Sequence, residues 1–178
     1  MIALTDRAFA LGIHTTARGF GWAVLEGPFS AYDHGVFTAK GRDKNQRCLA
    51  RVDRLIDEFA PEVLILESFD KESSMRSKRI RELCLSIVNR AADRGIAVAV
   101  YRRSDVQEAF SGVGARTREE VADATRRNLP MLNARWPEKP APGDGEDKRL
   151  AIFTAAALVL TWYHFGTLGL FDDLGRAA

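Results

Sequence analysis

The chain has 178 residues, of which 46% are hydrophobic and 28% charged, values typical of a folded domain with a full core. They exclude a disordered chain, and 26 Lys and Arg against 24 Asp and Glu leave a net charge of +2, which excludes a uniformly basic coat. Two cysteines, Cys48 and Cys84, exclude a disulfide framework and a four-cysteine zinc site. We expect one domain over residues 1–178, and a cytoplasmic setting because no signal peptide is evident at the N-terminus.

The first third of the chain is predicted to form three strands joined by short links. Residues 8–13 and 20–25 are apolar runs, and residues 30–38 form a third extended segment. Short links require antiparallel neighbours, because parallel strands need a long crossover connection. We therefore expect an antiparallel start to the sheet.

Two pairs of a helix and a strand follow. The apolar positions of residues 48–59 lie on one helical stripe that ends before Pro61, and the short apolar run 63–66 is typical of a buried parallel strand. Residues 80–91 form a second amphipathic helix, and 96–100 form a second buried strand.

The last third of the chain is predicted to be helical with one long loop. Ser104 is expected to cap a short helix, and a capping box beginning at Thr117 precedes a helix over 121–128. Residues 130–146 read as a loop rich in Pro and Gly. Residues 150–171 carry no Asp, Glu, Lys or Arg, but their alanine clusters and polar threonines favour a buried helix over a membrane span, so we expect no membrane association.

This order of elements predicts an α/β fold with a mixed five-stranded sheet, three strands antiparallel and then two parallel, and helices on both faces. In open sheets of this kind, functional residues gather beyond the carboxyl ends of the parallel strands. Those ends are His14, Glu67 and residues 101–103.

Each candidate at these ends has two interpretations. Glu67 is either a functional carboxylate or a salt-bridged acid. His14 is either a metal ligand, for an ion that accepts nitrogen, or a hydrogen-bonded structural residue. The acids before the last helix either complement its dipole or complete a metal cluster; they are Asp144, Glu146 and Asp147.

Basic residues crowd the segment after Glu67 and follow the neighbouring strand. A charge run is usually a solvated face, yet this one lies on the side where Glu67 would act, which points to a phosphate-rich partner. Phe69 either stacks on a base or belongs to the core. The candidate phosphate-binding residues are Arg18, Lys71, Arg76, Lys78, Arg79, Arg81, Arg102 and Arg103.

Several other features carry no function in this interpretation. Residues 112–114 lack the third glycine and the preceding strand of a dinucleotide-binding loop, so no nucleotide cofactor is expected. His34 and His164 are interpreted as structural, and both cysteines lie on apolar helix faces typical of core positions.

Three patches resemble bacterial Holliday-junction resolvases of the RuvC type. Residues 11–14 and 19–26, Leu-Gly-Ile-His and Gly-Phe-Gly-Trp-Ala-Val-Leu-Glu, resemble the family's opening, which usually runs apolar-Gly-Ile-Asp-Pro-Gly and then Gly-Trp-Gly/Ala-Val-apolar-Glu. Residues 64–69, Leu-Ile-Leu-Glu-Ser-Phe, resemble its second acidic motif, and 146–160 resemble its final acid-headed, alanine-rich helix. The order of elements agrees over most of the chain.

The resemblance implies a ribonuclease H-like fold and a homodimer that cuts branched DNA with two divalent ions, Mg²⁺ or Mn²⁺, held by carboxylates. Carried over by position, Glu67 is the retained acid, whereas His14 stands where the family has its leading aspartate. Losing that carboxylate predicts weaker Mg²⁺ binding. Matching the start of the last helix makes Asp147 the final acid, and matching its alanine-rich run places Thr154 there instead.

Three hypotheses follow from this departure. The protein is a metal-dependent nuclease that uses Mn²⁺ or another nitrogen-tolerant ion, a catalytically inactive relative that binds structured DNA, or a module for protein partners. In the first, Glu67 and Asp147 hold the ion, and His14 is the third ligand or the general base.

Overall fold

In the computed structural model, which describes residues 8–72, 74–138, 142 and 145–176, five strands form one mixed sheet in the order β3-β2-β1-β4-β5. The two pairs β1–β2 and β2–β3 are antiparallel, and the pairs β1–β4 and β4–β5 are parallel, so the predicted topology is confirmed. The strands are β1 (Ala10–Thr15), β2 (Gly19–Leu25), β3 (Ala31–Thr38), β4 (Val63–Glu67) and β5 (Ala97–Tyr101).

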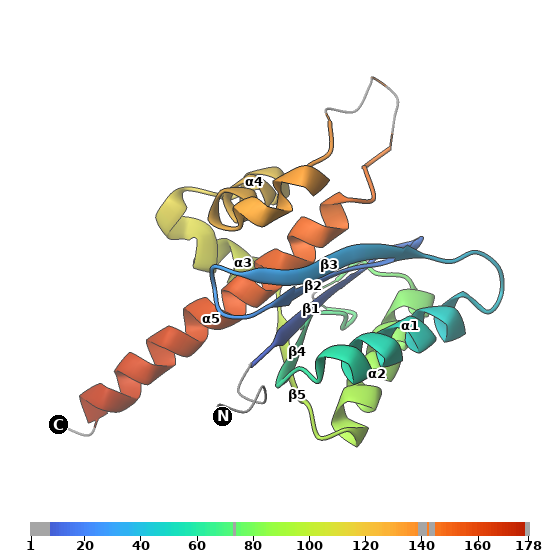
Figure 1. Cartoon of the computed structure of the whole chain (residues 1–178), viewed down its shortest axis with the longest axis horizontal. Helices are drawn as coiled ribbons and strands as arrows, with labels where there is room; N and C mark the ends of the chain where they lie inside the picture. Colours follow the sequence, from blue (N-terminus) through green and yellow to red (C-terminus); the bar gives the residue numbers. More distant parts are fainter. Residues whose placement is uncertain (1–7, 73, 139–141, 143–144, 177–178) are drawn as a thin grey trace, which may run out of the picture.

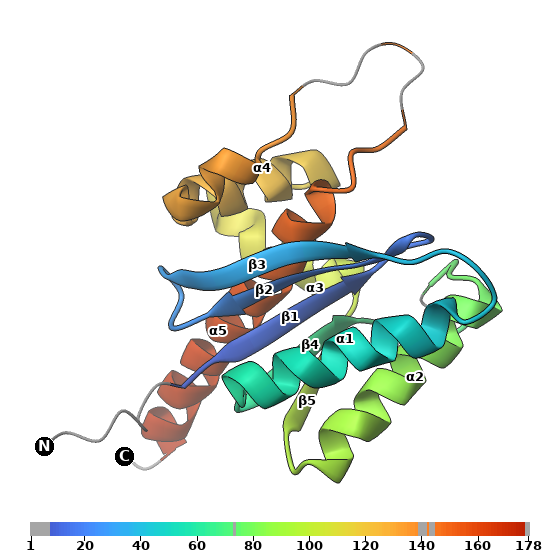
Figure 2. The same ribbon diagram turned by 45° about the vertical axis from the view of Figure 1, so that its right-hand side comes forward.

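Helices cover both faces of the sheet, as predicted (Figures 1 and 2). Helices α1 and α2 lie together on one face, and the long helix α5 crosses the other face with α3 and α4 packed against it. The helices are α1 (Lys44–Phe59), α2 (Lys78–Asp93), α3 (Arg103–Phe110), α4 (Arg118–Asn128) and α5 (Leu150–Arg176).

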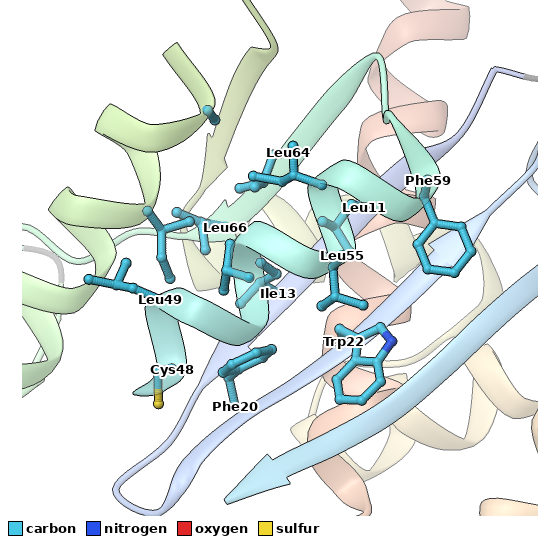
Figure 3. Packing of buried hydrophobic residues seen from close by; sticks show 14 of the residues in the cluster. Leu11, Ile13, Phe20, Trp22, Cys48, Leu49, Leu55, Phe59, Leu64 and Leu66 are labelled. Carbon is cyan, nitrogen blue, oxygen red and sulfur yellow. The ribbon is translucent and has the colours of Figure 1, made fainter. Parts of the chain in front are cut away.

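The core beneath α1 and α2 follows from the alternation of side chains along each strand. Leu11 and Ile13 of β1 and Leu64 of β4 are completely buried on this face, where Leu55 of α1 meets them (Figure 3). Successive side chains of a strand point to opposite faces. The intervening residues of β1 and β4 therefore point toward α5.

Helix α5 approaches the other face closely because glycines line the seam. A Cβ atom at Gly12 would lie 2.2 Å from the carbonyl oxygen of Ala155, and one at Gly21 would lie 2.5 Å from the carbonyl carbon of Ala151. The alanine-rich sequence of α5 thus serves contact with the sheet, as predicted. Within the part of the chain that the structure describes, no helix is both long and apolar enough to cross a membrane.

Two local expectations are corrected. Ser104 lies inside α3 and does not cap it; the helix begins at Arg103, and the Asp105 carboxylate accepts a hydrogen bond of 2.6 Å from the backbone N–H of Arg102. The expected loop 130–146 starts as a short 3₁₀ helix, Pro130–Arg135. The capping box at Thr117 is confirmed: its hydroxyl accepts a hydrogen bond from the Glu120 N–H.

Candidate functional site

The carboxyl ends of β1 and β4 bring His14 and Glu67 side by side. Strand β1 runs past the predicted end at residue 13 because His14 and Thr15 still pair with Gly21 and Phe20 of β2. In the parallel pair, Ile13 lies opposite Leu66, so the next residue on each strand is His14 and Glu67. Both side chains leave the sheet on the face that α5 covers.

Glu67 is held by two nitrogen-bearing side chains. Its Oε2 lies 2.7 Å from Nη2 of Arg76 and 3.2 Å from Nδ1 of His14. The Arg76 guanidinium is fixed in turn at the end of β1, where its Nη1 donates to the Thr15 carbonyl oxygen at 2.9 Å and to the Thr15 hydroxyl. The side chains of His14, Glu67 and Arg76 are only 9%, 18% and 13% exposed.

Burial and charge set the protonation of this cluster. Burial alone would raise the pKa of Glu67, but the neighbouring imidazole of His14 and the guanidinium groups of Arg76 and Arg118 outweigh it and lower the pKa to about 2. Desolvation lowers the pKa of His14 more strongly than Glu67 raises it. At neutral pH the cluster therefore holds an ionised carboxylate, a neutral imidazole and a cationic guanidinium.

Asp147 shares a cavity with His14 that Glu67 does not line. Asp147 and Glu146 line a cavity of about 260 Å³ together with His14 and Arg18. The Asp147 carboxylate is engaged by Arg149, whose Nη2 donates to its Oδ2 at 2.7 Å, and this hydrogen bond lowers the pKa of Asp147. Asp144, the remaining predicted acid of this segment, lies outside the described residues.

Thr154 and Asp147 line different cavities. Thr154 borders a narrow crevice that also contains Glu67, whereas Asp147 borders the cavity at His14. The separation arises because Asp147 precedes α5, whereas Thr154 lies about one turn inside it, so the two side chains stand at different heights along the helix axis. Of the α5 residues that line the crevice with Glu67, Thr154 is the polar one, and its hydroxyl donates to the Leu150 carbonyl oxygen at 3.2 Å.

The residues at the strand ends do not fit a divalent ion in this arrangement. Among the residues that the structure describes, no three His, Cys, Asp or Glu side chains are grouped so that they could hold a metal. Each of the two candidate carboxylates is paired with an arginine, Glu67 with Arg76 and Asp147 with Arg149. The ligand set His14, Glu67 and Asp147 stays a prediction.

The predicted basic segment divides into internal and exposed residues. Besides Arg76, Arg79 and Arg81 are half-buried and bond to the protein itself: Arg79 donates to Asn45 Oδ1 at 2.8 Å and to the Ala17 carbonyl at 3.2 Å, and Arg81 donates to the Arg76 carbonyl. Phe69 packs against the core beneath α1 and α2, which favours its core interpretation. The exposed members of the predicted set are Arg18, Lys71, Lys78, Arg102 and Arg103.

Two arginines at the crevice were not predicted. Arg116 and Arg118 flank Thr117 at the start of α4 and line the crevice together with Arg103 and Glu67. Arg103 and Arg116 form no ion pair with another described residue, and Arg118 lies 3.8 Å from Glu146 in an exposed pair. The sequence signal was the pair of arginines around the capping box, but only the packing of α4 on α5 places them beside Glu67.

Comparisons with known proteins give the same fold. No protein-family model matches the chain. The crossover junction endodeoxyribonuclease RuvC of Leifsonia xyli subsp. xyli is 28% identical over 106 residues, which are 57% of this chain and 49% of that protein. The chain thus spans about half the length of the curated relative that it matches.

Solved structures resemble the chain along most of its length. Thermus thermophilus RuvC has a TM-score of 0.67 at 24% identity, covering 90% of this chain and 96% of its own, and the same RuvC in complex with a Holliday junction substrate has 0.66 at 22%, covering 91% and 96%. The yeast mitochondrial Holliday junction resolvase Ydc2 has 0.60 at 12%, covering 99% and 86%. The chain therefore has the RuvC-like, ribonuclease H-like fold that its motifs predicted.

Proposed function

We propose that this RuvC-like protein binds branched DNA at the edge of the sheet where β1, β4 and β5 end. The observation that carries the proposal is the gathering of Arg103, Arg116 and Arg118 at the crevice beside Glu67. Guanidinium groups bind phosphates through paired hydrogen bonds, so three of them at one edge form a track for a nucleic-acid backbone. One structural relative, the RuvC of Thermus thermophilus, was solved with a Holliday junction substrate, which supports a branched ligand.

Further exposed cations extend this surface. Arg102 precedes Arg103 at the end of β5, Lys71 follows β4, and Arg18 lies between β1 and β2. All three stand at or next to the loops that leave the carboxyl edge, where the fold collects its functional side chains. In this proposal they bind phosphates on the arms of the DNA, away from the point where the four arms meet. Lys78 at the start of α2 continues the track.

A cytoplasmic homodimer is part of the same proposal. A four-way junction has two-fold symmetry, and an isologous dimer presents the same surface twice around such an axis. The two copies of the surface formed by Arg103, Arg116 and Arg118 would then bind two equivalent arms of the junction. Light scattering of the free protein measures this directly, and a mass of one chain at working concentrations contradicts the dimer.

Phosphodiester cleavage is the second candidate function. The observation that favours it is the neutral, buried imidazole of His14 beside the ionised Glu67, because a neutral imidazole can accept a proton from an attacking water. Asp147 lines a cavity together with His14 and is the second acid of this candidate site. The geometry supports binding better than cleavage, because both acids are already paired with arginines.

The binding experiment compares a labelled four-way junction with a linear duplex built from the same arms, by fluorescence anisotropy over a series of salt concentrations. We expect the junction to bind at least about tenfold more tightly, and the affinity to fall steeply with salt. The double variant Arg103→Gln/Arg118→Gln should bind the junction about tenfold more weakly with a shallower salt slope. Arg47→Gln/Arg54→Gln, which also removes two positive charges but at exposed positions of α1, is the matched control.

Equal affinity for junction and duplex, or an unchanged affinity in the double variant, contradicts the proposed function. The same samples are incubated with Mg²⁺ and with Mn²⁺ and resolved on denaturing gels. We expect the junction strands of the wild type to stay intact. Cleavage by the wild type that disappears in Glu67→Gln establishes the second candidate function, and Mg²⁺-dependent cleavage gained in His14→Asp identifies His14 as the residue that replaced a metal ligand.

A further inference from the structure

The Glu67 carboxylate already has a cation of its own. The 2.7 Å separation of Arg76 Nη2 and Glu67 Oε2 is that of a charge-assisted hydrogen bond between fully charged partners. Both side chains are largely withdrawn from solvent, at 13% and 18% exposure, so water screens their attraction only weakly. This pair differs from surface ion pairs of the chain such as Lys78–Glu82, where the side chains are 85% and 60% exposed.

Arg76 is also fixed in place. One terminal nitrogen contacts Glu67 while the other donates to both oxygens of Thr15, so the planar guanidinium bridges the ends of β4 and β1. Its own backbone is tied to the structure, because the Arg76 N–H donates to Ser74 Oγ at 3.2 Å and the Arg76 carbonyl accepts from Arg81. A side chain held at three points is a structural component of the site.

This position of Arg76 conflicts with a divalent ion at Glu67. Both cations would approach the same carboxylate in a partly desolvated setting, where two positive charges repel strongly. Among the residues that the structure describes, no further acid is grouped with His14 and Glu67 to hold the ion. Its neighbour on β1 is the His14 imidazole, and α5 lines the same crevice with Thr154, Ala157 and Leu158, none of which carries a charge.

We propose that Arg76 is the resident cation of this site, a guanidinium that occupies the place beside Glu67 where a divalent ion would bind. The strand-end site then keeps its charge balance and its shape without metal. This inference rests on the proposed function only in its consequence, which is that DNA backbones meet a carboxylate already neutralised by Arg76. The substitution at His14 and the pairing of Arg76 together close the site to an ion.

The test is rescue of a missing charge by Mn²⁺, measured on the full-length protein without DNA. Thermal unfolding is recorded with EDTA and with millimolar Mn²⁺ for the wild type, Arg76→Gln, Arg76→Lys and the double variant Arg76→Gln/Glu67→Gln. We expect Mn²⁺ to raise the Tm of Arg76→Gln by about 4 °C, because the ion then takes the vacated position beside Glu67. The wild type, Arg76→Lys and the double variant should each shift by less than about 1 °C, as the first two retain a cation and the last has no carboxylate.

Two results overturn the inference. One is a Mn²⁺ shift of the wild type that is lost in Glu67→Gln, because an ion then binds beside Arg76. The other is an equal response of Arg76→Gln and its double variant. If Arg76→Gln does not fold, electron paramagnetic resonance of Mn²⁺ added to wild type and to Glu67→Gln decides: equal amounts of bound ion support the inference, and a Glu67-dependent bound ion overturns it.

Failure of this inference is separable from failure of the proposed function. The Mn²⁺ measurements contain no DNA, and the junction measurements by anisotropy are made in EDTA. If the protein prefers the junction but the Mn²⁺ measurements contradict the role of Arg76, the proposed function stands and this inference fails. If the Mn²⁺ measurements support Arg76 but the protein shows no preference for the junction, this inference stands and the proposed function fails.

Discussion

Two groups of arginines lie within one edge of the molecule and serve opposite purposes. The first, internally bonded group stands at the entry to α2 and comprises Arg76, Arg79 and Arg81. Its side chains donate hydrogen bonds to Glu67, to Asn45 and to backbone carbonyls. The second, open group lies around the starts of α3 and α4 and comprises Arg103, Arg116 and Arg118, which are exposed and line the crevice. In the sequence, the first group is the denser cluster of charge, and yet the second is the one open to a ligand.

The difference teaches that charge density along the chain does not measure charge available to a partner. An arginine in a loop that crosses the ends of buried strands meets backbone carbonyls that need donors, and it satisfies them. An arginine at the exposed start of a helix keeps its donors, because the unpaired backbone groups there are N–H donors and offer it no acceptor. Predictions that separate the two groups by stability and by affinity test this distinction.

The largest expected effect is on stability at Arg76. Arg76→Ala leaves Glu67 as an uncompensated, largely buried carboxylate, and losing one partner of such a pair costs about 3 kcal/mol of the free energy of unfolding. Urea denaturation at neutral pH measures the change. Arg103→Ala is the matched control from the open group and should change the free energy of unfolding by less than about 0.5 kcal/mol. Equal losses in the two variants would erase the distinction between the groups.

Acid should lower the free energy of unfolding in two stages, neither larger than the loss expected in Arg76→Ala. His14 has a lowered pKa in the folded state, so stability begins to fall when the pH drops below about 6.5, where the unfolded chain takes up the proton first. Glu67 has a folded pKa of about 2 against 4.5, so its contribution, about 3 kcal/mol, is present above pH 4.5 and is lost as the pH falls through 2.

Urea denaturation between pH 7 and pH 3 in wild type, His14→Gln and Glu67→Gln separates these stages. The slope of stability against pH below 6.5 should flatten in His14→Gln, and the slope below 4.5 should flatten in Glu67→Gln. An unchanged slope below pH 4.5 in Glu67→Gln would mean that the carboxylate is not held by cations in solution.

The smallest effect is expected at Arg79. Its bonds to Asn45 and to the Ala17 carbonyl join α1, α2 and the β1–β2 loop, and hydrogen bonds of this kind each contribute about 1 kcal/mol. Arg79→Gln should therefore lower the free energy of unfolding by about 2 kcal/mol, with little loss of junction affinity. Lys78→Gln, one residue earlier but exposed, should weaken junction binding and leave the free energy of unfolding nearly unchanged. A junction affinity that falls more in Arg79→Gln than in Lys78→Gln would place Arg79 in the open group.

Features set by local periodicity were predictable from the sequence. The strands, the buried helix α5 and the Thr117 cap follow from apolar alternation, alanine content and a four-residue signal, each of which acts within a few residues. The meeting of His14 and Glu67 also followed, because parallel strand ends share one edge. The cap at Ser104 was wrong because Asp105, the next residue along, binds the Arg102 N–H instead.

The partners of each arginine were not predictable, because they depend on contacts between distant segments. Arg76 meets Thr15 from 61 positions away, and Arg79 meets Ala17 from 62. The same holds for the choice between Asp147 and Thr154, which spacing left open. The structure places them at separate cavities, because α5 is anchored in register against the glycines of β1 and β2.

That anchoring has a consequence for how this protein can change. With Ala155 packed against the bare backbone of Gly12, α5 cannot slide along the sheet or lift from it without breaking van der Waals contact along the whole seam. The wall of the crevice that α5 forms is therefore held by main-chain contacts. A different activity would arise by exchanging the side chains that line the crevice and not by moving this helix. A designer who wishes to give this scaffold a different activity can exchange crevice residues such as Arg103, Arg118 and Thr154 while the seam holds α5 in place against the sheet.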